Sequence, residues 1–260
     1  MGKKAVFITV RTASTRLPNK AFLEILGKPT IQYVIDLAKR SVEKDIVVLC
    51  TTTRPEDDIL EKIAEQNGIF CFRGSENDKL ERWKGAVQKF GVDFFVTADG
   101  DDLLCEPELI DLGFRQYART GADFIEGGDS IVCGGFTYGI KAGALAKACD
   151  IKGSNETEMM WTYFKDTGLF NTEALDCEKL FKRPDIRLTL DYIEDFRLFE
   201  TIFNHFNGKG FNLKDVIAYL DRNPDVLKIN QFRLKDWADN QKKKTKLVLK
   251  EGIGNGNKKQ

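Results

Sequence analysis

The chain has 260 residues and carries 40 acidic and 40 basic side chains, so it has no formal net charge at neutral pH. This balance excludes a global field that would hold nucleic acid or an anionic membrane, so a phosphorylated ligand would have to be bound by local charges. The length suffices for one large domain with a buried core. Six scattered cysteines without a C-x-x-C motif, a single histidine and no membrane-length apolar run lead us to expect a cytoplasmic protein without a structural zinc site.

The first half of the chain alternates strand-like and helix-like segments. Apolar residues recur at three- and four-residue spacing in the helix-like segments, whereas the strand-like segments are short apolar runs. This alternation is typical of βαβ units and predicts a mostly parallel sheet. Strands are expected at residues 5–10, 45–51, 69–72 and 93–97, and helices at residues 29–41, 55–67 and 77–90.

A loop with the sequence RTASTRLPNK, residues 11–20, directly follows the first expected strand. It contains three cations (Arg11, Arg16 and Lys20) and two hydroxyl groups (Ser14 and Thr15). Cationic side chains and converging backbone amides favour concentrated negative charge, so the loop could surround a polyphosphate. The alternative is a solvated basic loop, and spacing alone does not decide between the two.

An acidic cluster follows the fourth expected strand. Asp99, Asp101 and Asp102 come just after residues 93–97, so we expect them at the same edge of the sheet as the loop. Carboxylates brought together repel one another unless a cation is present, and Mg²⁺ is the usual hard cation in such a place. The alternative is an acidic turn that caps the helix expected to start near Glu106.

The second half is less regular. Glycines interrupt a region around residues 126–170, which we interpret as a small insertion over the carboxyl ends of the strands. The last residues, 241–260, are rich in Lys, Gly and Asn and are expected to form a flexible tail after a domain at residues 1–240. In this half, strand-like pieces lie at residues 131–133, 136–140 and 188–191, and helices are expected at residues 157–166, 192–206 and 212–223.

Four motifs in chain order resemble those of the cytidylyltransferase family. They are R-x-x-S-T-R-L-P-x-K with the turn LGKP at residues 26–29, FRGSEND at residues 72–78, DGDD with EPELID at residues 99–111, and RLTLD with EDF at residues 187–196. The family includes the acylneuraminate and ketodeoxyoctulosonate cytidylyltransferases, and the match is most similar to the spore-coat polysaccharide biosynthesis proteins. The motifs span residues 4–206.

The resemblance implies a three-layer α/β/α nucleotide-diphospho-sugar transferase fold, Rossmann-like, with a mostly parallel mixed sheet. It also implies a homodimer that couples CTP to an acidic sugar or to a phosphorylated or phosphonate acceptor, with release of pyrophosphate, in cell-surface glycan biosynthesis. The residues that this assigns are Arg11, Arg16, Lys20 and Asp101 to catalysis, Arg11, Ser14, Thr15, Arg16, Lys20, Arg73 and Asp99 to nucleotide binding, and Asp101 with Asp191 to Mg²⁺. The DGDD sequence also allows Asp99 in place of Asp101 as the metal ligand.

Two departures from the family pattern bear on the site. Ala13 stands where the family usually has glycine, and a Cβ there restricts positive φ and close approach of the backbone to a phosphate. Residues 157–162 read TEMMWT where spore-coat relatives often have REHVTP, so the acceptor pocket is expected to differ. Glu158 could face that pocket or lie on a solvated helix face, and core packing is the commoner use of Trp161. Ser75 could line the nucleotide or acceptor site, or Ser75 or Asn77 could instead cap the helix that follows.

Other functions stay open at this stage. The loop recognises what all nucleotides share, so another base such as guanine is an alternative, and a non-catalytic nucleotide-binding homologue is a second one. A glycosyltransferase would share the acidic metal motif but has no need for the loop. We interpret His205, near the end of the helix at residues 192–206, as structural, and without it no nucleophilic hydrolase can be assembled.

Overall fold

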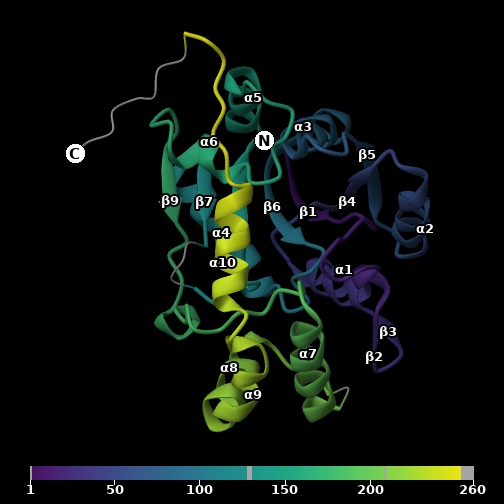
Figure 1. The fold of residues 1–260 in the computed structure, drawn as a ribbon. Helices are drawn as coiled ribbons and strands as arrows, with labels where there is room; N and C mark the ends of the chain where they lie inside the picture. Colours follow the sequence, from purple (N-terminus) through teal and green to yellow (C-terminus); the bar gives the residue numbers. More distant parts are fainter. Residues whose placement is uncertain (1, 128–130, 208, 253–260) are drawn as a thin grey trace.

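A seven-stranded sheet with the strand order β5-β4-β1-β6-β8-β7-β9 forms the centre of the molecule (Figure 1). The computed structural model describes residues 2–127, 131–207 and 209–252. β8 runs antiparallel to both β6 and β7, while the other neighbouring strands are parallel. The strands are β1 (Lys3–Thr9), β4 (Ile46–Thr52), β5 (Phe70–Gly74), β6 (Val92–Asp99), β7 (Phe124–Glu126), β8 (Tyr138–Lys141) and β9 (Thr172–Ala174), with β2 (Glu24–Ile25) and β3 (Lys28–Pro29) in a separate hairpin.

Helices cover both faces of the sheet, which gives the three layers of an α/β/α fold. Alternation along β1 sends Val6 and Ile8 into one apolar core and Ala5 and Phe7 into the other. The first core is completed by α1 (Thr30–Arg40), α2 (Asp58–Gln66), α4 (Pro107–Thr120), α7 (Ile193–Phe206) and α8 (Leu213–Arg222), and the second by α3 (Lys79–Phe90), α5 (Ala142–Ile151) and α6 (Trp161–Lys165). Short 3₁₀ turns are η1 (Lys20–Phe22), η2 (Pro55–Asp57) and η3 (Lys179–Phe181).

The strand predicted at residues 188–191 does not join the sheet. β6 already pairs with β1 on one side and with β8 on the other, so no edge is left for a further strand beside it. The segment is extended instead and bonds to two loops: Leu188 N donates to Cys133 O at 2.8 Å and Leu190 N donates to Asp101 O at 2.9 Å. It therefore still brings Asp191 to the carboxyl end of β6.

Two other predicted elements differ in extent. The strand expected at residues 131–133 is reduced to a single bridge between Cys133 and Arg187. The helix expected at residues 157–166 begins only at Trp161, because Thr157 is held outside it: its hydroxyl donates to Asp78 Oδ1 at 2.8 Å.

The end of the chain is folded further than expected. The predicted boundary at residue 241 falls inside α10 (Leu234–Lys244), which follows α9 (Pro224–Gln231). The next residues run along α5, where Gly153 N donates to Val248 O at 2.7 Å and Lys250 N donates to Ile151 O at 2.9 Å. The remainder of the predicted tail, residues 253–260, lies outside the described residues. Within the described ranges, no helix combines the length and the apolar character that crossing a membrane requires.

Candidate active site

A cleft of about 990 Å³ lies at the carboxyl ends of β1 and β6. It brings together the loop after β1, the acidic segment after β6 and the extended segment before α7. The predicted residues that line it are Arg11, Ser14, Thr15, Arg16, Lys20, Asp99, Asp101 and Asp191. Arg73 does not line it: its guanidinium lies 2.6 Å from Asp58 and donates to Thr52 O on the β5 side of the sheet. The expected role of Arg73 in nucleotide binding therefore has no support in this geometry.

Lys20 joins the two predicted metal ligands. Its Nζ lies 2.5 Å from Asp101 Oδ2 and 3.0 Å from Asp191 Oδ1, and it donates to Leu190 O at 2.8 Å. Burial alone would lower the pKa of Lys20, but the two carboxylates outweigh it and raise that pKa. Burial would raise the pKa of Asp101, yet the Lys20 ammonium holds it below its ordinary value. Lys20 thus lies beneath the loop as a counterion instead of pointing freely toward a phosphate.

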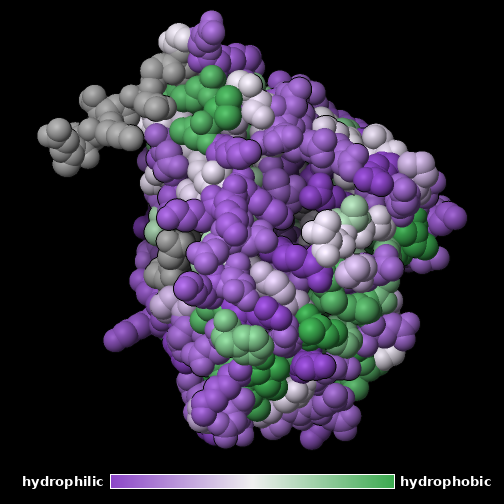
Figure 2. Space-filling model, in the orientation of Figure 1, coloured by the Kyte–Doolittle hydropathy of each residue, from purple (hydrophilic) through white to green (hydrophobic). Residues whose placement is uncertain are grey.

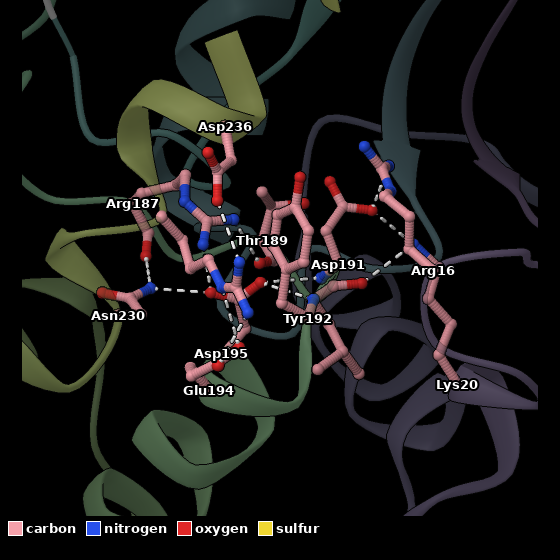
Figure 3. Close-up of polar contacts among 12 residues, drawn as sticks. Arg16, Lys20, Arg187, Thr189, Asp191, Tyr192, Glu194, Asp195, Asn230 and Asp236 are labelled. Atoms are coloured by element: carbon pink, nitrogen blue, oxygen red, sulfur yellow. Dashed lines mark hydrogen bonds and ion pairs between the residues drawn. The ribbon is translucent and has the colours of Figure 1, made fainter. Parts of the chain in front are cut away.

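Arg16 is a loop cation with an unused hydrogen-bond donor. One guanidinium nitrogen lies 2.5 Å from Asp191 Oδ1, and the group sits over the Tyr192 ring at 5.5 Å (Figure 3). The other terminal nitrogen, Nη1, is shielded from solvent and has no hydrogen-bond partner among the residues that the structure describes. A buried donor of this kind needs an acceptor, and a phosphate oxygen is a strong one.

Asp195 holds the Asp191 segment in place (Figure 3). It is fully buried, forms an ion pair with the buried Arg187, and accepts hydrogen bonds from Asp191 N at 2.9 Å and Tyr192 N at 2.8 Å. Asn230 Nδ2 donates to its other oxygen at 2.9 Å. The R-x-T-x-D-x-x-x-D spacing therefore contains one cleft carboxylate and one buried carboxylate that fixes its backbone.

The acidic segment offers a set of oxygen ligands for a hard divalent cation. Carboxylate oxygens of Asp99, Asp101 and Asp102 all lie within 4.8 Å of one another. Burial, together with the neighbouring charges of Asp101 and Asp99, raises the pKa of Asp102 well above its ordinary value. Burial also raises the pKa of Asp99, although Lys79 at 3.4 Å opposes the shift. Carboxylates crowded in this way fit a bound cation, since charge neutralisation would relieve their repulsion.

Glu158 faces the cleft, which settles the alternative left open by the sequence. Its carboxylate lies 3.3 Å from the Arg11 guanidinium and lines the cavity. Burial would raise the pKa of Glu158, but Lys79 and Arg11 outweigh it and the pKa is lowered. Trp161 also lines the cleft, although part of it packs against the second core.

Two cations of α3 were missed by the sequence reasoning. Lys79 and Arg82 both line the cleft and are only 8% and 3% exposed. Asp78 caps this helix by accepting from Glu81 N at 3.1 Å, so neither Ser75 nor Asn77 is the cap. The available signal was a capped helix whose first and second turns each carry a cation on the same face.

The loop is anchored by a buried carboxylate that the sequence reasoning also missed. Asp57 accepts from Thr12 N and from Thr12 Oγ1, each at 2.8 Å, and from Thr51 Oγ1 at 3.0 Å. Ala13 is accommodated without left-handed backbone, because Asn19, Leu26 and Asn207 are the non-glycine residues with positive φ in the described ranges. His205 lies outside the cleft and stacks on Tyr219 at 3.9 Å, in agreement with a structural role.

The protein has a three-layer α/β/α fold of the nucleotide-diphospho-sugar transferase kind, with a mostly parallel sheet, a cationic loop after β1 and an acidic segment after β6. The sequence model of the family described as Cytidylyltransferase matches residues 5–195, and the chain belongs to this family.

Two relatives match over most of their length and a third over less than half of it. The protein MJ1063 of Methanocaldococcus jannaschii is 30% identical over 86% of this chain and 92% of its own. The spore coat polysaccharide biosynthesis protein SpsF of Bacillus subtilis is 25% identical over 84% of this chain and 94% of its own. A 3-deoxy-manno-octulosonate cytidylyltransferase of Proteus mirabilis is 31% identical over 45% of this chain and 46% of its own.

Solved structures show the same architecture. A cytidylyltransferase from Leptospira borgpetersenii superposes with a TM-score of 0.79 at 27% identity, covering 86% of this chain and 96% of that one. A CMP:2-keto-3-deoxy-manno-octonic acid synthetase complexed with CTP superposes with a TM-score of 0.59 at 15% identity, covering 78% and 99% of the two chains. At that identity the second likeness concerns the fold alone.

Proposed function

We propose that the protein transfers the CMP group of CTP to an acidic sugar or to a phosphorylated or phosphonate acceptor, and that it serves the synthesis of cell-surface glycans or glycoconjugates. The observation that carries the proposal is the convergence of the cationic loop and of the carboxylates Asp101 and Asp191 in one cleft. Membership in the cytidylyltransferase family supports cytosine as the base. The resemblance of the motifs also supports a homodimer, which sedimentation equilibrium would test.

In the proposed reaction an acceptor oxygen attacks the α-phosphorus of CTP, a new phosphorus–oxygen bond forms, and pyrophosphate leaves. A hydroxyl acceptor gives its proton to a base or to solvent. Arg11 and Arg16 would neutralise the triphosphate, while Ser14 and Thr15 would donate hydrogen bonds to it. Such a transfer depends chiefly on positioning and on charge stabilisation.

The cluster of Asp99, Asp101 and Asp102 fits Mg²⁺, and Asp101 would hold the ion together with Asp191, since Lys20 is bonded to both of these carboxylates. The ion would supply charge neutralisation for the transferred phosphoryl group. Lys20 holds the two carboxylates close together, because it is bonded to both. Asp99 remains the alternative ligand, since it lies in the same cluster.

The test is a pyrophosphate-release screen of CTP, ATP, GTP and UTP against ulosonic acids, sugar phosphates and phosphonates with Mg²⁺ present. We expect turnover with CTP and one acceptor class, and calorimetry should show that CTP binds more tightly than the other three nucleotides. GTP binding as tightly as CTP would overturn the base assignment. The absence of turnover with every pair, combined with normal CTP binding, would favour a non-catalytic homologue.

Two substitutions test the metal pair. Asp101→Asn and Asp191→Asn should each abolish Mg²⁺-dependent turnover far more than they weaken CTP binding, because the ion acts on charge that develops during transfer. Asp36→Asn is the matched control, since Asp36 pairs with Lys28 on the surface, outside the cleft. Full activity of Asp191→Asn would rule out the pairing.

A further inference from the structure

The C-terminal helix α10 forms one wall of the cleft. Leu234, Trp237, Ala238 and Gln241 line the cavity, and their spacing places them on one face of the helix. Lys242, Lys244 and the following Thr245 line it as well. α10 crosses the front of the molecule between the α8–α9 end and α5 (Figure 1). The family model matches residues 5–195, and α10 lies after that segment.

α10 is attached at its two ends instead of being packed into a core. At its start, the Arg233 guanidinium lies 3.0 Å from Glu194 Oε1, and at its far end Val248 O accepts from Gly153 N at 2.7 Å. No residue of α10 itself is buried, and the surface over it is mainly hydrophilic (Figure 2). α10 therefore adds nothing to either core, while one of its faces lines the cleft.

The chemistry of this wall points to the ligand. Trp237 lines the cleft, yet its Nε1 is shielded from solvent and has no hydrogen-bond partner in the part of the chain that the structure describes. Trp161 is a second indole lining the same cleft, beside the ion pair of Glu126 with Lys165 at 2.7 Å. Indole rings offer apolar faces and one N–H donor each. They therefore suit a ligand that has an apolar face of C–H groups and oxygen atoms at its edge.

We infer that the inward face of α10 is the acceptor-contacting wall of the cleft, with Trp237 as the specificity-determining residue for a polyhydroxylated, sugar-sized acceptor. This inference rests on the proposed transferase function. The nucleotide end of the cleft is formed by the loop at residues 11–20 and by the acidic segment, whose charges suit a triphosphate and its cation, whereas Trp237 and Gln241 are uncharged. Trp237 and Gln241 therefore contribute to acceptor binding and not to CTP binding.

The test is a calorimetric titration of the full-length protein, with and without CTP, using four probes: 3-deoxy-manno-octulosonate, N-acetylneuraminate, glucose 1-phosphate and 2-aminoethylphosphonate. We expect a hydroxylated probe to bind the wild type, and Trp237→Ala to weaken that binding about tenfold. Trp237→Phe, which keeps an aromatic ring and removes the donor, should weaken it about fivefold. Both variants should bind CTP like the wild type.

Lys243→Ala is the matched control, because Lys243 lies on α10 but does not line the cleft. It should leave every titration unchanged. Equal affinity of the sugar probes for wild type and Trp237→Ala would overturn the inference, as would binding of 2-aminoethylphosphonate alone or binding of none of the four. Failure of the wild type to bind CTP would refute the proposed function separately, since the probe titrations are also made without nucleotide.

Discussion

At position 20, one ammonium group holds two carboxylates that would otherwise repel each other. Lys20 is bonded to both Asp101 and Asp191, and its side chain is 17% exposed. We predict that Lys20→Met lowers the free energy of unfolding by about 2 kcal/mol, because removing one partner of a mostly buried pair leaves the others uncompensated. Mg²⁺ should raise the melting temperature of this variant more than that of the wild type, since a divalent cation can replace the lost charge.

The control for this prediction is Lys28→Met. Lys28 pairs with Asp36 at 2.7 Å, but both side chains are well exposed, and such surface pairs contribute about 0–1 kcal/mol. Thermal unfolding monitored by circular dichroism, with Mg²⁺ or with EDTA, measures both variants. Equal responses of Lys20→Met and wild type to Mg²⁺ would show that the carboxylates do not share a cation site.

Asp57 gives a pH-dependent prediction at the same scale. Burial would raise the pKa of Asp57, but hydrogen bonds from Thr52, Thr12 and Thr51 outweigh it and lower the pKa. A carboxyl group whose pKa is depressed on folding stabilises the protein above its ordinary pKa, and that stabilisation disappears as the pH falls through the folded value. Asp57→Asn should therefore cost about 2 kcal/mol near neutral pH and progressively less below about pH 4.

Urea unfolding at a series of pH values measures this difference. Asp58→Asn is a matched control, because its side chain is 58% exposed and its ion pair is with the Arg73 guanidinium. A difference between wild type and Asp57→Asn that stays constant on acidification would mean that the Asp57 charge is not what stabilises the loop.

At the scale of elements, the start of α7 depends on one buried ion pair. Asp195 and Arg187 are 0% and 1% exposed, and Asp195 also receives the backbone N–H groups of Asp191 and Tyr192. Asp195→Asn should lower the free energy of unfolding by about 3 kcal/mol, because Arg187 would remain buried without a counterion. Glu194→Gln is the neighbouring control: Glu194 pairs with Arg233, whose side chain is 31% exposed, so the loss of this pair should cost less than the loss of the fully buried one, about 1 kcal/mol.

Unfolding and activity measurements on the same variant separate a role of Asp195 in positioning the Asp191 segment from a role in stability alone. If Asp195 fixes the Asp191 segment, turnover of Asp195→Asn should fall well before the protein unfolds, and Mg²⁺ should be needed at higher concentration. Unchanged Mg²⁺ dependence at a temperature where the variant is fully folded would limit Asp195 to a role in stability.

Elements with strong patterns were predictable from sequence, and those that depend on distant partners were not. The apolar runs and helical spacing of the first half predict β1, β4, β5 and β6 with α1, α2 and α3 to within a few residues. β7 and β9 have only three residues each, too few for a pattern. α10 escaped prediction because its sequence is largely polar and it has no buried residue.

The candidate site shows the same division. Proximity of the loop to the acidic segment follows from the parallel order of β1 and β6, since both segments leave the same edge of the sheet. The pairing of Lys20 with Asp191 could not be predicted, because it requires residues 188–191 to bond to Asp101 and Cys133 instead of joining the sheet. Arg73 does not line the cleft, because its guanidinium bonds to Thr52 O and pairs with Asp58, whereas Arg82 of α3 does line it.

At the scale of the whole molecule, the nucleotide end and the wall formed by α10 come from separate parts of the chain. All the predicted loop and acidic residues precede residue 192, whereas α10 begins at Leu234. A chain that ends at residue 233 should therefore fold and bind CTP within about threefold of the full-length affinity. It loses the contacts of Leu247 and Leu249 with the second core, which should cost about 1–2 kcal/mol of stability.

Circular dichroism and calorimetry of this shortened chain check both expectations, with a chain ending at residue 252 as the matched control. Because α10 buries none of its residues, the loss of this helix should not disturb the packing of either core. Sugar probes that bind the full-length protein should no longer bind the shortened one, since Trp237 and Gln241 are gone. Loss of CTP binding in a folded shortened chain would contradict the division, because it would place α10 in the nucleotide site itself.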